Sequence, residues 1–287
     1  MILKRLGAIG LSILALSSCA INVTSKAFFH QDSAPTPLLM TTLHAQINSD
    51  ESTAGITRVE LMNGEGITLR GVAVAYAEPV ANIVFFPDNR MPLSENNRLL
   101  HRVGSIPANI LWMDYQGVGS SDKSPAFRID NVKADALVTF DYVKGTFDNS
   151  LPTIIHGRGI GAYFASYVAA NRQIDGLVLD GAFNNISDYI ANMMPGLSNS
   201  ITSMRLQSDV HDMQIAPILR HYDGPLWLVV GEKDVITPPA VSEALLAESL
   251  SAHKHLSVIP NARHKNTLMS PYAVDEYRRF LRQLNMQ

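Results

Sequence analysis

The stretch TIIHGRGIGA, residues 153–162, decides the fold of this chain. It begins with the short apolar run Thr153–His156, which has the length and composition of a strand that is buried on both faces. Three glycines follow at alternate positions and permit a sharp turn. Tyr163–Asn171 then has the spacing of a helix. A buried strand that turns directly into a helix is typical of a parallel sheet covered by helices.

The same alternation of short apolar runs and helical segments continues on both sides of this stretch. Upstream, Ile56–Met62 and Ile67–Ala75 flank the turn sequence NGEG and predict a hairpin. Other apolar runs predict strands at Asn82–Phe86, Ile110–Asp114, Gly176–Asp180, Leu226–Gly231 and Leu256–Pro260, and helical spacing predicts helices at Val132–Lys144, Pro239–Ser251 and Val274–Leu284. The sequence therefore predicts an α/β fold with a mostly parallel central sheet and helices on both faces.

Four segments at the ends of predicted strands carry the polar residues that chemistry would need. They are DYQGVGSS at 114–121, HGRGIG at 156–161, GEKDVITP at 231–238 and PNARH at 260–264. In this order they resemble the motifs of the α/β-hydrolase family, particularly its small single-domain esterase- and lipase-like members. The matching family patterns are D-Y-R-G-x-G-x-S, H-G-x-S-x-G, G-x-x-D-x-x-x-P and P-x-A-x-H. The resemblance covers residue 56 to the C-terminus and implies the α/β-hydrolase fold.

The resemblance implies a serine nucleophile, a histidine base and an orienting carboxylate. Asp234 and His264 stand at the acid and base positions, but Gly159 stands where the serine is expected. No other G-x-S-x-G segment occurs, so the resemblance predicts a degenerate hydrolase, or pseudoenzyme, with a His–Asp pair and a vacated nucleophile position. We expect one ring nitrogen of His264 to bond Asp234 and the other to face an empty space at Gly159.

The oxyanion hole that the resemblance implies is also altered. The family places H-G-N or H-G-G after an early strand, and this loop aims a backbone N–H group at the developing anion. Here the segment reads Phe86-Pro87-Asp88-Asn89. Pro87 has no N–H group, and Asp88 would add negative charge beside a site that stabilises an anion. Asn89 and the backbone N–H group of Ile160 remain as oxyanion-hole candidates.

Two alternatives remain open. In the first, the chain is an active carboxylic-ester-type hydrolase in which His264 acts as a general base on water, because imidazole titrates near neutral pH. In the second, the chain binds a dinucleotide, because Gly157-x-Gly159-x-x-Ala162 matches G-x-G-x-x-A and Asp180 ends the next predicted strand. This second alternative leaves the last two motif segments without a role.

The N-terminus has the features of an export signal. Two basic residues precede the apolar run Leu6–Leu16, which is too short for a comfortable transmembrane helix. LSSC at 16–19 resembles the lipobox of bacterial lipoproteins, so we expect residues 1–18 to be a signal peptide and Cys19, the only cysteine, to carry lipid. Acyl chains at about 0.8 kcal/mol per buried methylene group make a firm anchor. Since Ala20 follows, the resemblance implies the outer membrane of the bacterial envelope, facing the periplasm.

The remaining chain divides into a tether and one domain. Residues 19–54 are polar and predict an N-terminal tether that begins at the lipidated Cys19, although Phe28-Phe29 indicates local packing. Residues 55–287 predict the α/β-hydrolase-like domain. Within it, 183–223 break the strand–helix rhythm and predict a cap insertion over the carboxyl ends of the strands, where α/β folds form ligand sites.

The composition indicates which classes of partner molecule to expect. The net charge is −3, charged residues make up 17% of the chain, and no Lys/Arg cluster indicates nucleic acid. We expect the membrane to be a partner through the N-terminal lipid, and a small acyl or ester-like ligand or another envelope protein to be a second one. We expect neither a metal nor a cofactor.

Overall fold

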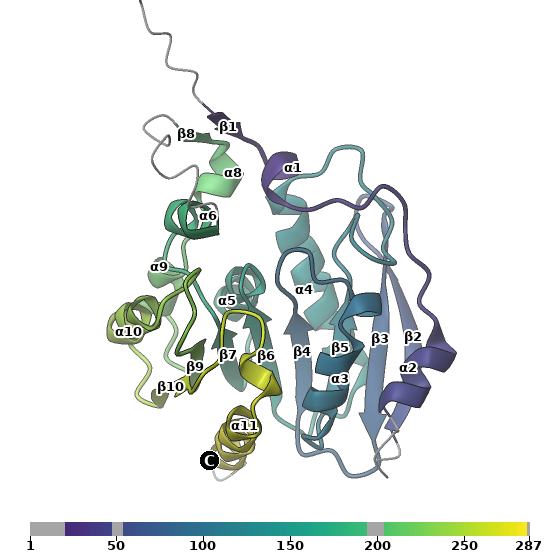
Figure 1. Ribbon diagram of the computed structural model, residues 1–287. Helices are drawn as coiled ribbons and strands as arrows, with labels where there is room; N and C mark the ends of the chain where they lie inside the picture. Colours follow the sequence, from purple (N-terminus) through teal and green to yellow (C-terminus); the bar gives the residue numbers. More distant parts are fainter. Residues whose placement is uncertain (1–20, 48–53, 194–203, 286–287) are drawn as a thin grey trace, which may run out of the picture.

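A computed structural model describes residues 21–47, 54–193 and 204–285 (Figure 1). The predicted signal peptide and Cys19 lie outside these residues. The main sheet has eight strands in the order β10-β9-β7-β6-β4-β5-β3-β2. Strand β3 pairs antiparallel with both β2 and β5, and the other neighbours are parallel. The predicted mostly parallel sheet is confirmed.

The strands of this sheet follow the predicted apolar runs closely. They are β2 (Ala54–Met62), β3 (Thr68–Tyr76), β4 (Asn82–Phe86), β5 (Asn109–Met113), β6 (Thr153–Arg158), β7 (Gly176–Asp180), β9 (Leu226–Gly231) and β10 (Lys254–Ile259). Strands β4, β5, β6, β7 and β9 are buried along their whole length. Because both of their faces are covered, these strands need apolar residues at every position rather than at alternate ones.

Helices cover both faces of the sheet and enclose two hydrophobic clusters. One face carries α4 (Ile129–Thr146), α5 (Gly161–Asn171) and α10 (Pro239–Glu248). The other face, nearer the viewer in Figure 1, carries α2 (Met40–Ile47), α3 (Asn97–Gly104) and α11 (Pro271–Leu284). Two short 3-10 turns, η1 (Leu93–Glu95) and η3 (Thr267–Met269), lie in loops. The expectation of helices on both faces is therefore confirmed.

The described residues of the predicted insertion at 183–223 form short elements. They are α6 (Ile186–Met193), β8 (Met204–Leu206), α8 (Ser208–His211) and α9 (Ala216–Leu219), and residues 194–203 lie outside the described part. Strand β8 pairs in parallel with β1 (Ile21–Val23), next to the short helix α1 (Ser25–Phe28). The N-terminal segment and the insertion thus meet at the upper end of Figure 1. We call β1, α1, α6, β8 and α8 the cap.

Residues 21–47 pack against the domain over most of their length, although the sequence predicted a tether there. Phe29 is only 1% exposed, and its ring contacts those of Tyr115 and Phe127. Leu43 and Ile47 of α2 are also buried. The packed structure therefore begins before residue 54. The packing that Phe28-Phe29 indicates is confirmed, but the scattered apolar residues of the rest of the segment show no period from which its packing could be predicted.

None of the helices among residues 21–47, 54–193 and 204–285 is both long enough and apolar enough to cross a bilayer.

Candidate functional site

The turn between β6 and α5 has the conformation that the motif predicts. Gly159 has a φ of +54°, in the left-handed region that glycine adopts without cost. A Cβ atom on Gly157 would clash with the backbone of Gly161, and one on Gly161 would clash with the backbone of Phe86. These two glycines therefore allow β6, α5 and the loop after β4 to approach closely. We call this turn the elbow.

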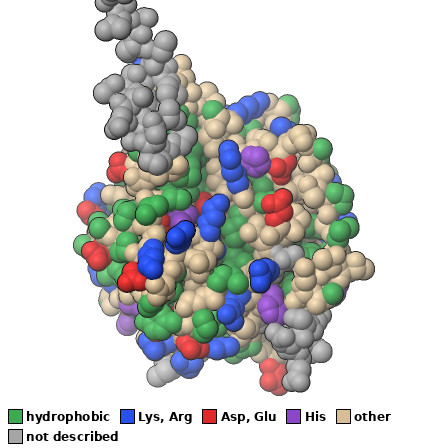
Figure 2. All heavy atoms as spheres, viewed as in Figure 1, with side chains coloured by type: hydrophobic (Ala, Val, Ile, Leu, Met, Phe, Trp, Pro, Cys, Tyr) green, Lys and Arg blue, Asp and Glu red, His purple; other side chains and the backbone are tan. Residues whose placement is uncertain are grey.

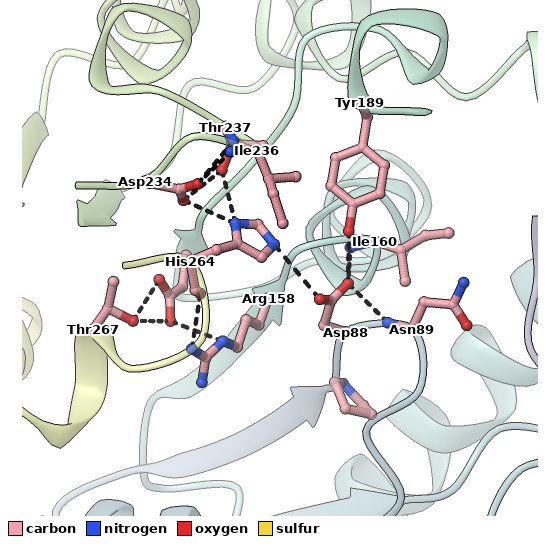
Figure 3. Close-up of polar contacts among 12 residues, drawn as sticks. Asp88, Asn89, Arg158, Ile160, Tyr189, Asp234, Ile236, Thr237, His264 and Thr267 are labelled. Atoms are coloured by element: carbon pink, nitrogen blue, oxygen red, sulfur yellow. Dashed lines mark hydrogen bonds and ion pairs between the residues drawn. The ribbon is translucent and has the colours of Figure 1, made fainter. Parts of the chain in front are cut away.

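Asp234 and His264 lie together, as the sequence predicts. They follow β9 and β10, and His264 Nδ1 is 2.8 Å from Asp234 Oδ2. Asp234 also accepts hydrogen bonds from the N–H groups of Ile236 and Thr237, and from the Thr237 hydroxyl at 2.8 Å. These contacts fix the carboxylate so that it can hold the imidazole in one orientation (Figure 3).

The space between His264 and Gly159 is filled, so the expectation of an empty space there is wrong. The carboxylate of Asp88, from the loop after β4, occupies it (Figure 3). Asp88 Oδ2 lies 3.5 Å from His264 Nε2, which is an ion pair rather than a short hydrogen bond. Asp88 Oδ1 accepts hydrogen bonds from the Tyr189 hydroxyl at 2.9 Å and from two backbone N–H groups.

Those two N–H groups belong to the predicted oxyanion-hole candidates. The Ile160 N–H group is 3.0 Å from Asp88 Oδ1 and the Asn89 N–H group is 2.8 Å from it. The side chain of Asn89 is used elsewhere, because it donates to the carbonyl of Phe28 and accepts from the backbone of His30. The donors that would stabilise an oxyanion therefore already hold the protein's own carboxylate.

The position of the Asp88 carboxylate requires that residue 159 is glycine. A Cβ atom on Gly159 would overlap the Asp88 carboxylate. Any residue with a side chain at position 159, serine included, would therefore displace Asp88 from the oxyanion hole. The sequence indicated that Asp88 was unfavourable near the hole, but not that its carboxylate would enter it.

Asp88, His264 and Asp234 form a buried chain of charges. Burial by itself would lower the pKa of His264, but hydrogen bonds and attraction to Asp234 and Asp88 raise it to about 9. Burial by itself would raise the pKa values of both carboxyl groups, but their interactions with His264 hold them below the ordinary value. At pH 7 all three groups are therefore charged, with the imidazolium between two carboxylates.

A second buried group of polar residues lies beside this chain. Arg158, the last residue of β6, donates from Nη2 to the carbonyl of His264 at 2.9 Å, and its Nε lies 3.7 Å from Asp180 Oδ2. The Thr267 hydroxyl contacts both oxygens of Asp180, at 2.8 and 2.6 Å. Arg158 and Thr267 were not predicted as site residues, because neither stands at a catalytic position of the motifs.

Two hollows reach this site from the surface. The large hollow, of about 570 Å³, is lined by Lys233, Val235, Ile236, Arg263, His264 and Lys265. The small hollow, of about 60 Å³, is lined by Asp88, Asn89, Arg90, Met91, Asn96, Arg158 and Lys265. Figure 2 shows Lys and Arg side chains gathered across the middle of this face, with hydrophobic side chains between them. Within the described ranges, no cluster of His, Cys, Asp and Glu could hold a metal ion.

Comparisons with known proteins agree with this fold. No family model matches the chain. The protein bem46 of Schizosaccharomyces pombe is 25% identical over 224 residues, which cover 74% of this chain and 72% of bem46. The Pyrococcus furiosus esterase Pf2001 has a TM-score of 0.68 at 13% identity, covering 89% of this chain and 98% of the esterase. A putative lipase, lip1, from Acinetobacter baumannii AYE has a TM-score of 0.64 at 15% identity, covering 89% and 99%. The chain has the α/β-hydrolase fold.

Proposed function

We propose that this protein is a lipid-anchored envelope protein that keeps the α/β-hydrolase fold without serine-hydrolase chemistry. The observation that carries the proposal is the Asp88 carboxylate, held in the oxyanion hole above Gly159 by the N–H groups of Ile160 and Asn89. Asp234 and His264 are kept as a structural ion pair in this proposal, rather than as the acid and base of a catalytic triad.

The chemistry of acyl transfer explains why this arrangement is inactive. A tetrahedral intermediate needs a nucleophile, and the hole must accept the negative charge that develops on the substrate oxygen. Loss of the nucleophile costs about 10⁶ in kcat, and loss of one oxyanion-hole donor costs about 10²–10³ in comparable hydrolases. Here both losses occur at one place, because the Asp88 carboxylate already holds the N–H groups that would stabilise the oxyanion.

The charge state of His264 opposes the alternative in which it activates water. A general base must be unprotonated, and a pKa of about 9 leaves only about one imidazole in a hundred unprotonated at pH 7. The atom that would take the proton, Nε2, also faces Asp88 Oδ2 rather than an open space. Both features favour a role in structure or ligand binding over hydrolysis.

The dinucleotide alternative lacks the free groups that it requires. Asp180, which would bind a ribose hydroxyl, is 0% exposed and faces Arg158 and Thr267. The N–H group of Ile160, at the start of α5, is directed at Asp88 instead of a phosphate. The interactions of Asp180 and Ile160 therefore give no support to a nucleotide site.

The test is reaction with a fluorophosphonate probe, together with a panel of activated esters. We expect no labelled serine and no burst of product from the purified protein, because the elbow carries Gly159 where a serine nucleophile would stand. An active serine esterase in the same assay serves as the positive control. Stoichiometric labelling of any serine in this chain would refute the proposal.

A further inference from the structure

The small hollow beside Asp88 has the lining of an anion site. Its wall contains three cationic side chains, Arg90, Arg158 and Lys265, and one carboxylate, Asp88. We propose that this hollow binds a small monocarboxylate. The carboxylate would be the ligand of a site at which the proposed function has no reaction. This proposal rests on that function only in that the ligand is not consumed.

Arg158 provides the main observation, because it is buried with unmet hydrogen-bond donors. The residue is 1% exposed, and its Nε has no hydrogen-bond partner. Nη2 is fixed by the carbonyl of His264, and within the described residues Nη1 makes no hydrogen bond (Figure 3). Buried donors without partners are costly, and a guanidinium group offers neighbouring donors that a carboxylate accepts with good geometry. Because Nε faces Asp180 Oδ2 at 3.7 Å, the free edge of the guanidinium group is the one that carries Nη1, and a carboxylate in the hollow would accept from that edge.

Arg90 provides a second, independent observation. Its φ of +59° lies in the left-handed region that residues with side chains seldom adopt. Strained backbone of this kind clusters at ligand clamps and active sites. The strain lies two residues after Asp88, in the loop that forms one wall of the hollow. The side chain of this strained residue lines the hollow.

The charges around the hollow match a single negative charge. The buried groups pair, because Asp88 and Asp234 flank His264, and Asp180 lies 3.7 Å from Arg158. Formal charges at pH 7 give four cations and three carboxylates, an excess of one positive charge: Arg90, Arg158, Lys265 and His264 against Asp88, Asp180 and Asp234. A monocarboxylate balances this excess, whereas a phosphate dianion would leave negative charge beside Asp88.

The volume limits the ligand to a few heavy atoms. A water molecule needs about 10–15 Å³ of this kind of volume, so the hollow of about 60 Å³ holds roughly four to six water-sized groups. Acetate and propionate fit that limit. Met91 contributes an apolar wall on which a short alkyl group can pack.

Calorimetric titration of the full chain in detergent tests the proposal, with acetate, propionate, inorganic phosphate and chloride as probes. We expect the two carboxylates to bind and the other two anions to bind at least tenfold more weakly. Arg158→Gln should weaken carboxylate binding at least tenfold, and Arg90→Gln should weaken it severalfold. Lys233→Gln is the matched control, because Lys233 lines the large hollow and not the small one. This variant should bind the carboxylates as tightly as the wild type does.

Substitution of the buried Arg158 also affects stability, so the variants of the exposed residues Arg90 and Lys265 keep the test decisive. The proposal is overturned if neither carboxylate binds the wild type at millimolar concentrations. It is also overturned if Arg90→Gln and Lys265→Gln both bind as the wild type does, or if phosphate binds more tightly than acetate. A positive fluorophosphonate reaction would refute the proposed function, yet it would leave these affinities unchanged.

Discussion

Positions 88 and 159 constrain each other through a few atoms. Asp88 accepts three hydrogen bonds through one oxygen and faces the imidazolium of His264 with the other. This arrangement requires that position 159 has no side chain. A carboxylate buried with these partners is stabilised in place, since charge-assisted hydrogen bonds are the stronger ones and a buried charge without partners is costly. The carboxylate and the glycine therefore act as one unit.

Restoring the serine alone should not restore activity. In Gly159→Ser the new side chain overlaps Asp88 and takes up a φ of +54°, so we expect a loss of about 1–3 kcal/mol in the free energy of unfolding. The double variant Asp88→Gly/Gly159→Ser frees the N–H groups of Ile160 and Asn89 and should react with a fluorophosphonate probe. Urea unfolding and probe labelling measure the two effects. Equal labelling of the single and double variants would show that Asp88 does not block the hole.

The raised pKa of His264 predicts a loss of stability in mild alkali. The folded-state pKa of about 9 lies above the ordinary 6.5, so the stabilisation is complete below pH 6.5 and is lost as pH rises through 9. At about 1.4 kcal/mol per unit of pKa, this is on the order of 3 kcal/mol for the buried pair. NMR titration of the imidazole and unfolding between pH 6.5 and 9.5 measure it.

Asp88→Asn is the matched variant for this measurement, because it keeps the shape of the side chain and removes its charge. The pKa of His264 should then fall by at least one unit, and the alkaline loss of stability should become smaller. If His264 titrates near 6.5 in the wild type, the buried chain of charges does not exist in solution.

At the level of elements, the sequence predicts best where a strand is buried on both faces. The predicted bounds of β4, β7 and β9 agree with the structure, because an apolar run between polar turns marks each of them. Helix α3 was not predicted, since its eight residues include two arginines and a histidine. The short pieces of the cap likewise show no period that would distinguish them from loops.

In the candidate site, too, some features could be predicted from the sequence and others could not. Asp234 and His264 stand at motif positions after strands, and the bond between them could be predicted from sequence. The location of the Asp88 carboxylate could not, because it depends on a hydroxyl group of Tyr189, 101 residues away on α6. Arg158 gains its role from Asp180 and from the backbone of His264, which come together only in the folded sheet.

Packing of the N-terminal segment against the core leads to a stability prediction. Phe29→Ala should lower the free energy of unfolding by about 3–5 kcal/mol, because a large ring is removed from a fully buried position. Leu39→Ala is the control, since Leu39 is 66% exposed, and it should change the free energy by less than about 0.5 kcal/mol. Urea unfolding distinguishes them. Similar small losses in both variants would indicate that residues 21–47 are only a tether.

At the level of the whole molecule, the position of β1 relates the proposed anchor to the cap. Ile21 already pairs with Met204 of β8, only two residues after Cys19. Two extended residues span at most about 7 Å, so a lipid on Cys19 would hold the cap close to the bilayer surface. Helix α11 ends at the opposite end of the molecule in Figure 1. We therefore expect the cap to face the membrane and the end of α11 to face away from it.

Two measurements on membranes test this orientation. The wild type should sediment with membranes and Cys19→Ala should be released, whereas Ser18→Ala, which keeps a small residue before the cysteine, should remain bound. Fluorophores attached to Asp212→Cys, directly after α8 of the cap, and to Arg282→Cys on α11 should differ in quenching, with lipid-headgroup quenchers acting mainly on the first. Both positions are exposed, so the labels should not disturb packing. Release of the wild type, retention of Cys19→Ala, or equal quenching at both positions would each contradict an anchor that places the cap against the bilayer.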